Sequence, residues 1–352
     1  MRVSEDLSGG NAAVVRAPKP GPSSGASRAR AARPGKVAQA KKAKPASPAK
    51  SRAKEPAAGT LPVLYMLSPQ KFMSPFDCNM ALDSGYKVVL PYAGVGVADV
   101  GALVQDAIFS RPPKARTGLF IGGKDITLAL HMMAAARKAM VPPFEVSVFA
   151  DPSGAFTTAA GMMAKVEQHL KKHFGGDLAG RKVSVFGATG PVGGCTAVIA
   201  AKYGAEVELV AHRTMDTVEA KANSYNQRYG VDIKCVDGSS DALKVEVLKN
   251  TDIALCCAAA GVRVMTIAQM AESMRLKVVA DVNAVPPTGA EGVDVFADGV
   301  AITGTQAFGI GALAIGNVKY KTQHNLLKQM LESEEKQYLD FLSAFEMARN
   351  SL

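Results

Sequence analysis

The fold is decided by residues 183–193, which read VSVFGATGPVG. The apolar run before Gly187 predicts a buried strand, and Pro191 is typical of the first position of a helix. The glycine spacing is G-x-x-G-x-x-G rather than G-x-G-x-x-G. In this arrangement Gly187 allows the tight turn, Gly190 lets backbone amides approach a pyrophosphate, and Gly193 permits close helix–strand packing. A tight turn without a ligand is the alternative, but the strand before and the helix after favour a dinucleotide site.

On both sides of this stretch, strand patterns alternate with helix patterns, which is typical of right-handed β-α-β units and a parallel sheet. We therefore expect a two-domain α/β protein. Residues 61–175 would form an N-terminal α/β substrate domain, and residues 176–315 a Rossmann-type parallel sheet for the nucleotide. A helical segment over residues 316–352 would pack back on the N-terminal domain. The expected strands are 62–67, 88–90, 118–121, 146–149, 183–186, 206–211, 233–236, 253–257 and 278–281.

The positive charge is confined to the N-terminal tail. Residues 1–60 hold 13 Lys and Arg against 3 Asp and Glu, with 15 Ala, 7 Pro and no aromatic residue, whereas the other 292 residues hold 28 of each charge. Such a tail cannot bury enough apolar surface to order itself, so we expect it to be disordered. It could contact anions or nucleic acid weakly and without specificity.

The sequence does not suggest a membrane or secreted protein. No apolar run approaches the length of a membrane span, and the N-terminus lacks the apolar core of a secretory signal. The five cysteines, none in a C-x-x-C pair, are interpreted as reduced and mostly buried thiols. These features indicate a cytoplasmic location and argue against structural zinc.

The strand 206–211 indicates the cofactor. An NAD site usually ends this strand with Asp or Glu for the ribose hydroxyls, but here His212 and Arg213 follow. A guanidinium group matches a 2′-phosphate, so we favour NADP, with NAD as an additional cofactor. The alternative is that Arg213 is a solvated surface residue.

Residue spacing narrows the type of dehydrogenase. No Tyr has a Lys four residues later, so the acid of short-chain dehydrogenases is missing. His169 and His173 have the spacing of a metal pair but no third ligand, and a solvated helix face is the favoured reading. A hydride-transfer site without evident acid–base groups fits a substrate carbon flanked by two nitrogens, whose lone pair expels the hydride.

From about Leu61 to the C-terminus, the chain resembles the methylene-tetrahydromethanopterin dehydrogenases of methylotrophic bacteria. The resemblance implies oxidation of N5,N10-methylene-tetrahydromethanopterin to the N5,N10-methenyl cation with NADP, in formaldehyde oxidation. It also implies a homo-oligomer, a pterin substrate bound between the two domains, and neither metal nor flavin. The segments that carry it are 68–69, 73–77, 105–111, 120–124, 142–144, 149–152, 154, 156–158, 281–287, 309–314 and 316–320.

Roles follow from the resemblance and from the position of each residue. Asp77 and Asp151 would stabilise the cationic product, although helix capping is an alternative for both. Lys124 would contact polar groups of the substrate. We expect the catalytic residues to be Asp77, Asp151 and Lys124, and the substrate-binding residues to be Ser74, Thr157, Thr158, Asn283 and Lys319. The expected cofactor-binding residues are Gly187, Thr189, Gly190, Pro191, Val192, Gly193, His212, Arg213, Ala258 and Asn283.

Two alternative functions remain at this point. One is another NADP-dependent two-domain dehydrogenase, of the methylene-tetrahydrofolate or shikimate type. The other is a nucleic-acid-binding protein that acts through the basic tail.

Overall fold

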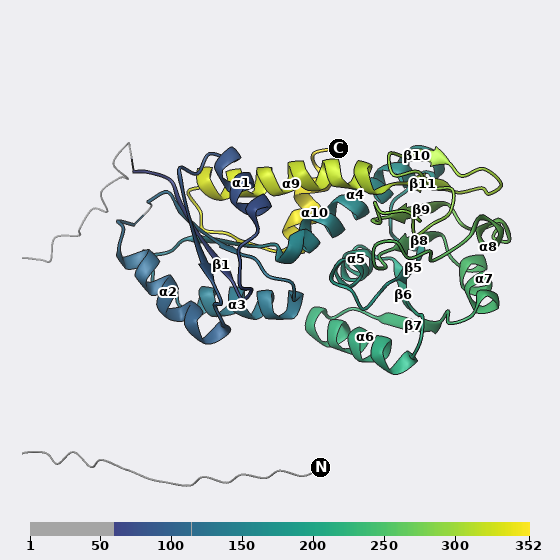
Figure 1. Cartoon of the computed structure of the whole chain (residues 1–352), viewed down its shortest axis with the longest axis horizontal. Helices are drawn as coiled ribbons and strands as arrows, with labels where there is room; N and C mark the ends of the chain where they lie inside the picture. Colours follow the sequence, from purple (N-terminus) through teal and green to yellow (C-terminus); the bar gives the residue numbers. More distant parts are fainter. Residues whose placement is uncertain (1–59, 114) are drawn as a thin grey trace, which may run out of the picture. The chain divides into compact units, whose positions relative to one another are not determined.

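The computed structural model describes residues 60–113 and 115–352 (Figure 1). The predicted disordered tail, residues 1–60, therefore lies outside the described residues except for Thr60. The described chain forms two mainly parallel sheets flanked by helices, which confirms the α/β prediction.

The first sheet is parallel throughout and has the strand order β12-β4-β3-β1-β2. Its inner strand β3 is buried along its whole length, whereas the edge strand β2 exposes Leu90 and Tyr92. The strands are β1 (Val63–Ser68), β2 (Val88–Ala93), β3 (Thr117–Ile121), β4 (Ser147–Ala150) and β12 (Tyr338–Leu339).

The helices of this part follow their strands as predicted, and their starts have local causes. Ser74 caps the first helix, since its side-chain oxygen accepts a hydrogen bond from the Asp77 amide at 3.4 Å, and Pro75 occupies the first helical position. The helices are α1 (Pro75–Asp83), α2 (Val97–Phe109), α3 (Ile126–Lys138), the short η1 (Pro152–Gly154) and α4 (Ala155–Phe174).

The second sheet has the strand order β10-β11-β9-β8-β5-β6-β7, and only the β10–β11 pair is antiparallel. The strand that precedes the glycine turn, β5, lies inside this sheet between β8 and β6. The sequence did not predict β10 and β11, which are short and contain glycine. The strands are β5 (Lys182–Phe186), β6 (Glu206–Ala211), β7 (Ile233–Asp237), β8 (Ile253–Cys256), β9 (Val278–Asp281), β10 (Asp298–Ala301) and β11 (Phe308–Ile310).

The predicted continuous helical segment at the C-terminus is wrong in its details. The chain instead forms a helix, then strand β12, then a second helix, because Val148 donates its amide to the Gln337 carbonyl at 2.8 Å and so draws the segment onto β4. Asp340 then caps the last helix through the Leu342 and Ser343 amides. The helices from residue 191 onward are α5 (Pro191–Lys202), α6 (Met215–Tyr229), α7 (Asp241–Lys249), α8 (Ile267–Ala271), α9 (Ala312–Glu332) and α10 (Phe341–Arg349).

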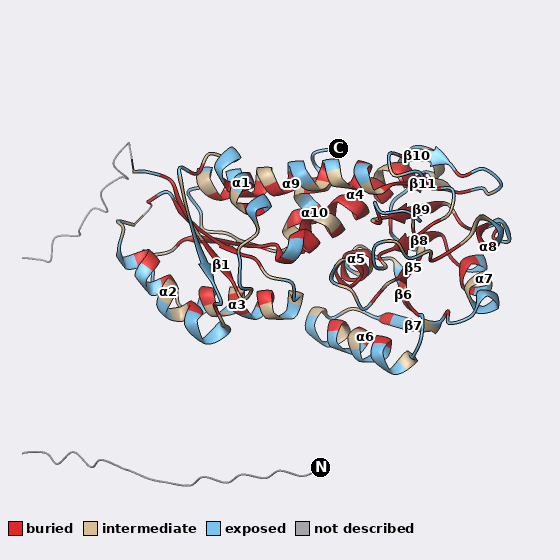
Figure 2. Ribbon diagram, in the orientation of Figure 1, coloured by how far each residue is buried: buried red, intermediate tan, exposed pale blue. Residues whose placement is uncertain are grey.

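Helix α4 is the central helix of the described chain. It packs against α9, α10 and α5, and most of its residues are buried (Figure 2). Helices α9 and α10 therefore pack back on the N-terminal part, as predicted. His169 on α4 is not on a solvated face, which corrects the expectation. Its Nε2 lies 2.7 Å from Asp298 on β10, and Lys165 pairs with the same carboxylate at 2.8 Å.

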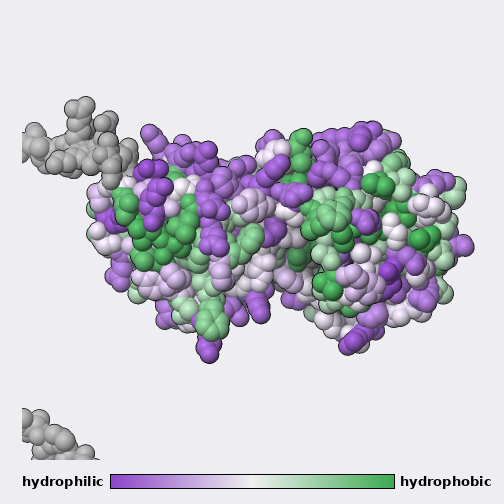
Figure 3. Space-filling model, turned by 45° about the horizontal axis from the view of Figure 1, so that its top comes forward, coloured by the Kyte–Doolittle hydropathy of each residue, from purple (hydrophilic) through white to green (hydrophobic). Residues whose placement is uncertain are grey.

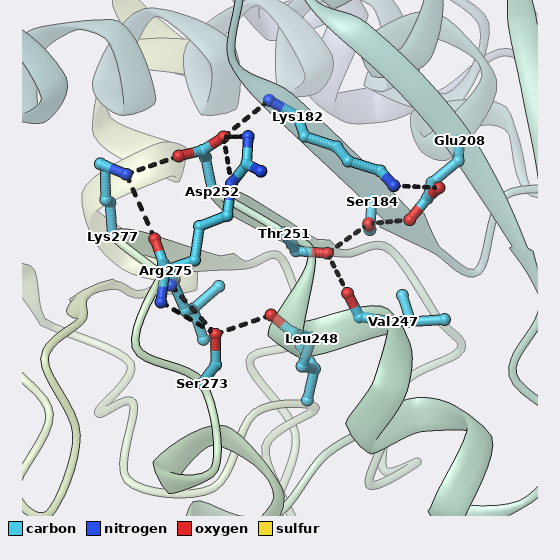
Figure 4. Close-up of polar contacts among 11 residues, drawn as sticks. Lys182, Ser184, Glu208, Val247, Leu248, Thr251, Asp252, Ser273, Arg275 and Lys277 are labelled. Carbon is cyan, nitrogen blue, oxygen red and sulfur yellow. Dashed lines mark hydrogen bonds and ion pairs between the residues drawn. The ribbon is translucent and has the colours of Figure 1, made fainter.

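A network of hydrogen bonds and ion pairs links the strands of the second sheet at their amino ends (Figure 4). Asp252, directly before β8, accepts hydrogen bonds from the Lys182 amide and the Arg275 guanidinium at 2.9 and 2.8 Å. Lys277 pairs with the other carboxylate oxygen. Burial alone would raise the pKa of Asp252, but the bonds from Arg275 and Lys277 outweigh it and lower that pKa to about 2. The network leaves the opposite, carboxyl ends of the strands for the glycine turn.

The surface carries apolar areas on both parts of the described chain (Figure 3). Among the described residues, no helix is both long and apolar enough to cross a membrane. The five cysteines are free, and Cys195, Cys256 and Cys257 are buried.

Candidate active site

The glycine turn after β5 has the close packing that its sequence predicts. Gly187 has a φ of +76°, and a Cβ there would overlap the backbone of Cys257 and Ala258. A Cβ on Gly193 would lie 2.7 Å from the Gly187 carbonyl oxygen, so helix α5 can approach the turn only through glycine. The turn thus presents the amino end of α5 at the carboxyl ends of the strands.

A pocket of about 750 Å³ lies over this turn. Most of the residues predicted to bind the cofactor line it, and Val192 and Gly193 do not; Gly193 is buried beneath the turn. The predicted residues that line it are Gly187, Thr189, Gly190, Pro191, His212, Arg213 and Ala258.

Two further cations line the same pocket and were missed by the sequence analysis. Lys244 comes from α7, and Arg263 from the loop after β8. Lys244 has a distant ion pair with Asp241, at 3.7 Å, and Arg263 one with Glu291, at 3.8 Å. Within the described chain, no carboxylate residue lines this pocket. The pocket therefore suits a ligand that carries several negative charges, and its glycine turn suits a pyrophosphate.

A second pocket, of about 480 Å³, lies at the carboxyl ends of the strands of the first sheet. Ser74, Asp77, Lys124 and Lys319 line it, so the structure brings four of the predicted site residues together. The Lys319 ammonium lies 4.3 Å from the centre of the Phe76 ring, which also lines the pocket. One carboxylate, three cationic side chains (with Lys71) and two aromatic rings (with Phe72) therefore line the same space.

Asp77 is the carboxylate of this second pocket, and it is almost completely buried, with 5% of its surface exposed. Gln323 on α9 donates a hydrogen bond from Nε2 to Asp77 Oδ1 at 2.7 Å. Burial raises the pKa of Asp77, and the bond from Gln323 and the charge of Lys319 oppose that rise. The sequence analysis did not place Gln323 in the site. A glutamine on an amphipathic helix usually faces solvent, and the sequence alone does not show that this one faces inward.

Asp151 and the two threonines after it lie beside this pocket rather than in it. Asp151 is fully buried and accepts hydrogen bonds from the amides of Phe156 and Thr157 and from the Thr157 hydroxyl, at 2.9, 3.2 and 2.6 Å. Burial raises the pKa of Asp151 to about 6. The Thr158 hydroxyl donates to the Gly154 carbonyl at 2.6 Å. These contacts are those of a cap on α4, which was the alternative reading of Asp151.

Asn283 organises the loop after β9. Its Oδ1 accepts from the amides of Gly261 and Val285, and its Nδ2 donates to the Pro287 carbonyl at 3.0 Å. The side chain thus ties the loop after β8 to the loop after β9 and lines neither of the two pockets.

The described residues, 60–113 and 115–352, contain no group of three or more His, Cys, Asp or Glu side chains placed to hold a metal ion.

This chain is similar to one known protein family and to several known proteins. The profile of the family "Methylene-tetrahydromethanopterin dehydrogenase, N-terminal" matches residues 75–153, which include α1 and part of the lining of the second pocket, with Asp77 and Lys124. Among solved structures, the shikimate 5-dehydrogenase of Listeria monocytogenes is 14% identical, with a TM-score of 0.49, over 85% of this chain and 99% of that chain. That likeness is too distant to bear on function.

Two curated relatives come from Methylorubrum extorquens. The "Bifunctional protein MdtA" is 33% identical over 275 residues, which cover 78% of this chain and 93% of the relative. The "NAD(P)-dependent methylenetetrahydromethanopterin dehydrogenase" is 46% identical over 288 residues, which cover 81% of this chain and 97% of the relative. At that identity and coverage, the chain belongs to the methylene-tetrahydromethanopterin dehydrogenase family.

Proposed function

We propose that this protein oxidises N5,N10-methylene-tetrahydromethanopterin to the N5,N10-methenyl cation, with NADP as the hydride acceptor, in formaldehyde oxidation. The observation that carries the proposal is the 46% identity to the NAD(P)-dependent dehydrogenase that acts on this pterin. The glycine turn under a 750 Å³ pocket supports it, because a nicotinamide dinucleotide needs both.

A preference for NADP over NAD is supported by the charges of this pocket. His212 and Arg213 follow β6, where NAD sites usually carry a carboxylate, and Lys244 adds a second fixed positive charge. The 2′-phosphate that distinguishes NADP would gain charge-assisted hydrogen bonds there. NAD, which lacks that phosphate, would still find the glycine turn and is proposed as a weaker cofactor.

The oxidation of the methylene group needs no proton transfer by the protein. NADP⁺ supplies a hydride acceptor: the methylene C–H bond breaks with its electron pair, and a nitrogen lone pair forms the C=N bond of the cation. The protein's part is to orient the pterin and to stabilise the developing positive charge. Asp77 is the residue proposed to supply the negative charge. Ser74, Lys124 and Lys319 are proposed to contact polar groups of the carrier.

The same proposal assigns roles to the parts of the chain. Residues 61–175 with the segment 316–352 would bind the pterin, and residues 176–315 would bind the cofactor. The inclusion of β12 in the first sheet supports placing the C-terminal segment with the pterin part.

We further propose a homo-oligomer in the cytoplasm. The exposed apolar side chains of the edge strand β2 support oligomer formation. For the basic tail we propose weak, salt-sensitive contacts with anions, on the basis of its charge alone. Light scattering of the full-length protein tests the oligomeric state. Nucleic-acid binding measured at increasing salt concentration tests the contacts of the tail.

The experiment that tests the proposed function compares two carriers. The purified protein is assayed for NADPH formation with methylene-tetrahydromethanopterin and with methylene-tetrahydrofolate. We expect a higher kcat/KM with the methanopterin carrier. Activity with the folate carrier alone would contradict the proposal.

A further inference from the structure

Gln323 is a buried amide that links two helices at the second pocket. It has no exposed surface, and it lies on α9 among the buried apolar residues Val318 and Leu326. Its Nε2 donates to Asp77 Oδ1 on α1 at 2.7 Å. Its Oε1 is buried as well and has no hydrogen-bond partner among the described residues.

Such a residue is costly to bury. A buried amide oxygen without a partner loses its hydration and gains no hydrogen bond in exchange, which destabilises the folded state. An apolar side chain of the same size would avoid that cost of burying the amide oxygen. The bond to Asp77 is the only compensation that the described structure offers, so the amide is best explained by what it does to that carboxylate.

We propose that Gln323 is a positioning residue that holds the Asp77 carboxylate in its charged form and directed at the second pocket. This inference rests on the proposed function, because it gives Asp77 the task of stabilising a cationic product. Gln323 itself does not line the pocket and acts only through Asp77.

The surroundings of Asp77 explain why it needs this partner. Burial raises the pKa of Asp77, and two groups on α9, the Gln323 amide and the Lys319 ammonium, oppose that rise. The other titratable groups nearby are Asp151 just before η1, Cys78 on α1, and Lys71 and Lys124 at the pocket. If the bond from Gln323 is lost, the pKa of Asp77 rises further, so a higher pH is needed to keep the carboxyl group ionised.

The loss of the Gln323 hydrogen bond should slow the reaction rather than weaken substrate binding. The reduced substrate carries no positive charge at its methylene bridge, and the product does. A negative charge at Asp77 therefore interacts more strongly with the transition state and the product than with the bound substrate. Loss of that charge lowers kcat and leaves KM for the pterin nearly unchanged.

The test uses the full-length protein and the pH profile of its kcat with methylene-tetrahydromethanopterin and NADP. Gln323→Met keeps the volume and removes the hydrogen bond. Gln329→Met is the matched control, since Gln329 lies on the same helix and donates to Gln337 instead. Gln323→Glu keeps the size and shape and places a second acid beside Asp77. NADP binding and thermal unfolding are measured for each variant to verify the fold.

We expect kcat of Gln323→Met to fall roughly 10- to 100-fold on the acidic limb of the profile, the range of a lost charge-assisted hydrogen bond, and by less at neutral pH. The acidic limb of the kcat profile of Gln323→Met should move to higher pH, while Gln329→Met should keep the pH profile of the unaltered protein. Gln323→Glu should move the limb in the same direction, because two adjacent carboxylates disfavour each other's ionisation.

A folded Gln323→Met or Gln323→Glu protein with an unchanged pH profile would overturn the inference. If Gln323→Met does not fold, the profile of Gln323→Glu decides. The proposed function fails separately, and only if the unaltered protein does not oxidise this substrate.

Discussion

Arg213 is the residue on which the choice of cofactor depends. It is exposed, it lines the first pocket directly after β6, and it has no ion pair within the described chain. A charge-assisted contact to a 2′-phosphate contributes about 1.5–3 kcal/mol, which corresponds to roughly 10- to 150-fold in affinity. Arg213→Ala should raise KM for NADP within this range and leave KM for NAD nearly unchanged. Because Lys244 and His212 line the same pocket, we expect the lower end of the range.

Steady-state kinetics with both cofactors check this expectation, with Arg228→Ala on α6 as the control, since Arg228 does not line the pocket. An equal loss of NADP and NAD use in Arg213→Ala would mean that the residue is structural.

Gly190 is the residue on which the pyrophosphate contact depends. A Cβ there would lie 3.3 Å from the Gly187 carbonyl, which a small shift can accommodate, so the protein should still fold. The larger side chain of Gly190→Val would, however, stand where backbone amides must approach the phosphates. We expect the affinity for NADP to fall by about tenfold or more, measured by calorimetry.

Gly101→Val is the matched control, because no atom lies within 4 Å of a Cβ at Gly101 on α2. Unchanged NADP affinity in Gly190→Val would place the nucleotide elsewhere.

At the residue scale, the sequence predicts what is local and misses what is brought together by the fold. The glycine turn and the Ser74 cap each follow from a few consecutive residues. Lys244 and Gln323 do not, because each belongs to a site only through a strand or helix far away in the chain. Thr157 was expected to face the substrate, but its hydroxyl is used by Asp151, and no local pattern distinguishes the two arrangements.

At the scale of elements, the network around Asp252 should make the stability of the second sheet depend on pH. The pKa of Asp252 is lowered from 3.8 to about 2 in the folded protein. Its contribution is therefore fully present above about pH 4 and is lost as the pH falls towards 2. Because Arg275 is half exposed, we expect about 1–2 kcal/mol rather than the full value of the shift.

Urea unfolding of Asp252→Asn and of the unaltered protein from pH 7 to pH 2 checks this expectation. The difference in the free energy of unfolding should shrink at acid pH, and exposed Asp232→Asn should show no such trend. A difference that stays constant over this range would contradict the role of the ion pairs.

Elements with a strong hydrophobic pattern were predicted well, and short ones were not. The strands β5 and β6 lie within one residue of their expected bounds, 183–186 and 206–211. The two-residue strand β12 has no periodicity of its own and exists because β4 offers a free edge. Likewise, β10 is held by Lys165 and His169 through Asp298, contacts that join residues more than 100 positions apart.

At the scale of the whole molecule, the family was predictable because many short segments occur in the same order along the chain. The 46% identity over 288 residues confirms that prediction, and the two mainly parallel sheets flanked by helices confirm the fold class. Roles that depend on the pterin itself were not predictable to the same degree, since the second pocket draws on α1, α9 and the loops after β1 and β3 at once.

The central claim is that a hydride passes directly from the methylene carbon of the pterin to NADP. A single turnover of the full-length protein with substrate deuterated at the methylene carbon tests it most directly. We predict that deuterium appears at C4 of the NADPH nicotinamide, mole for mole with the methenyl product. NADPH that forms without deuterium, or deuterium released to water, would contradict the account.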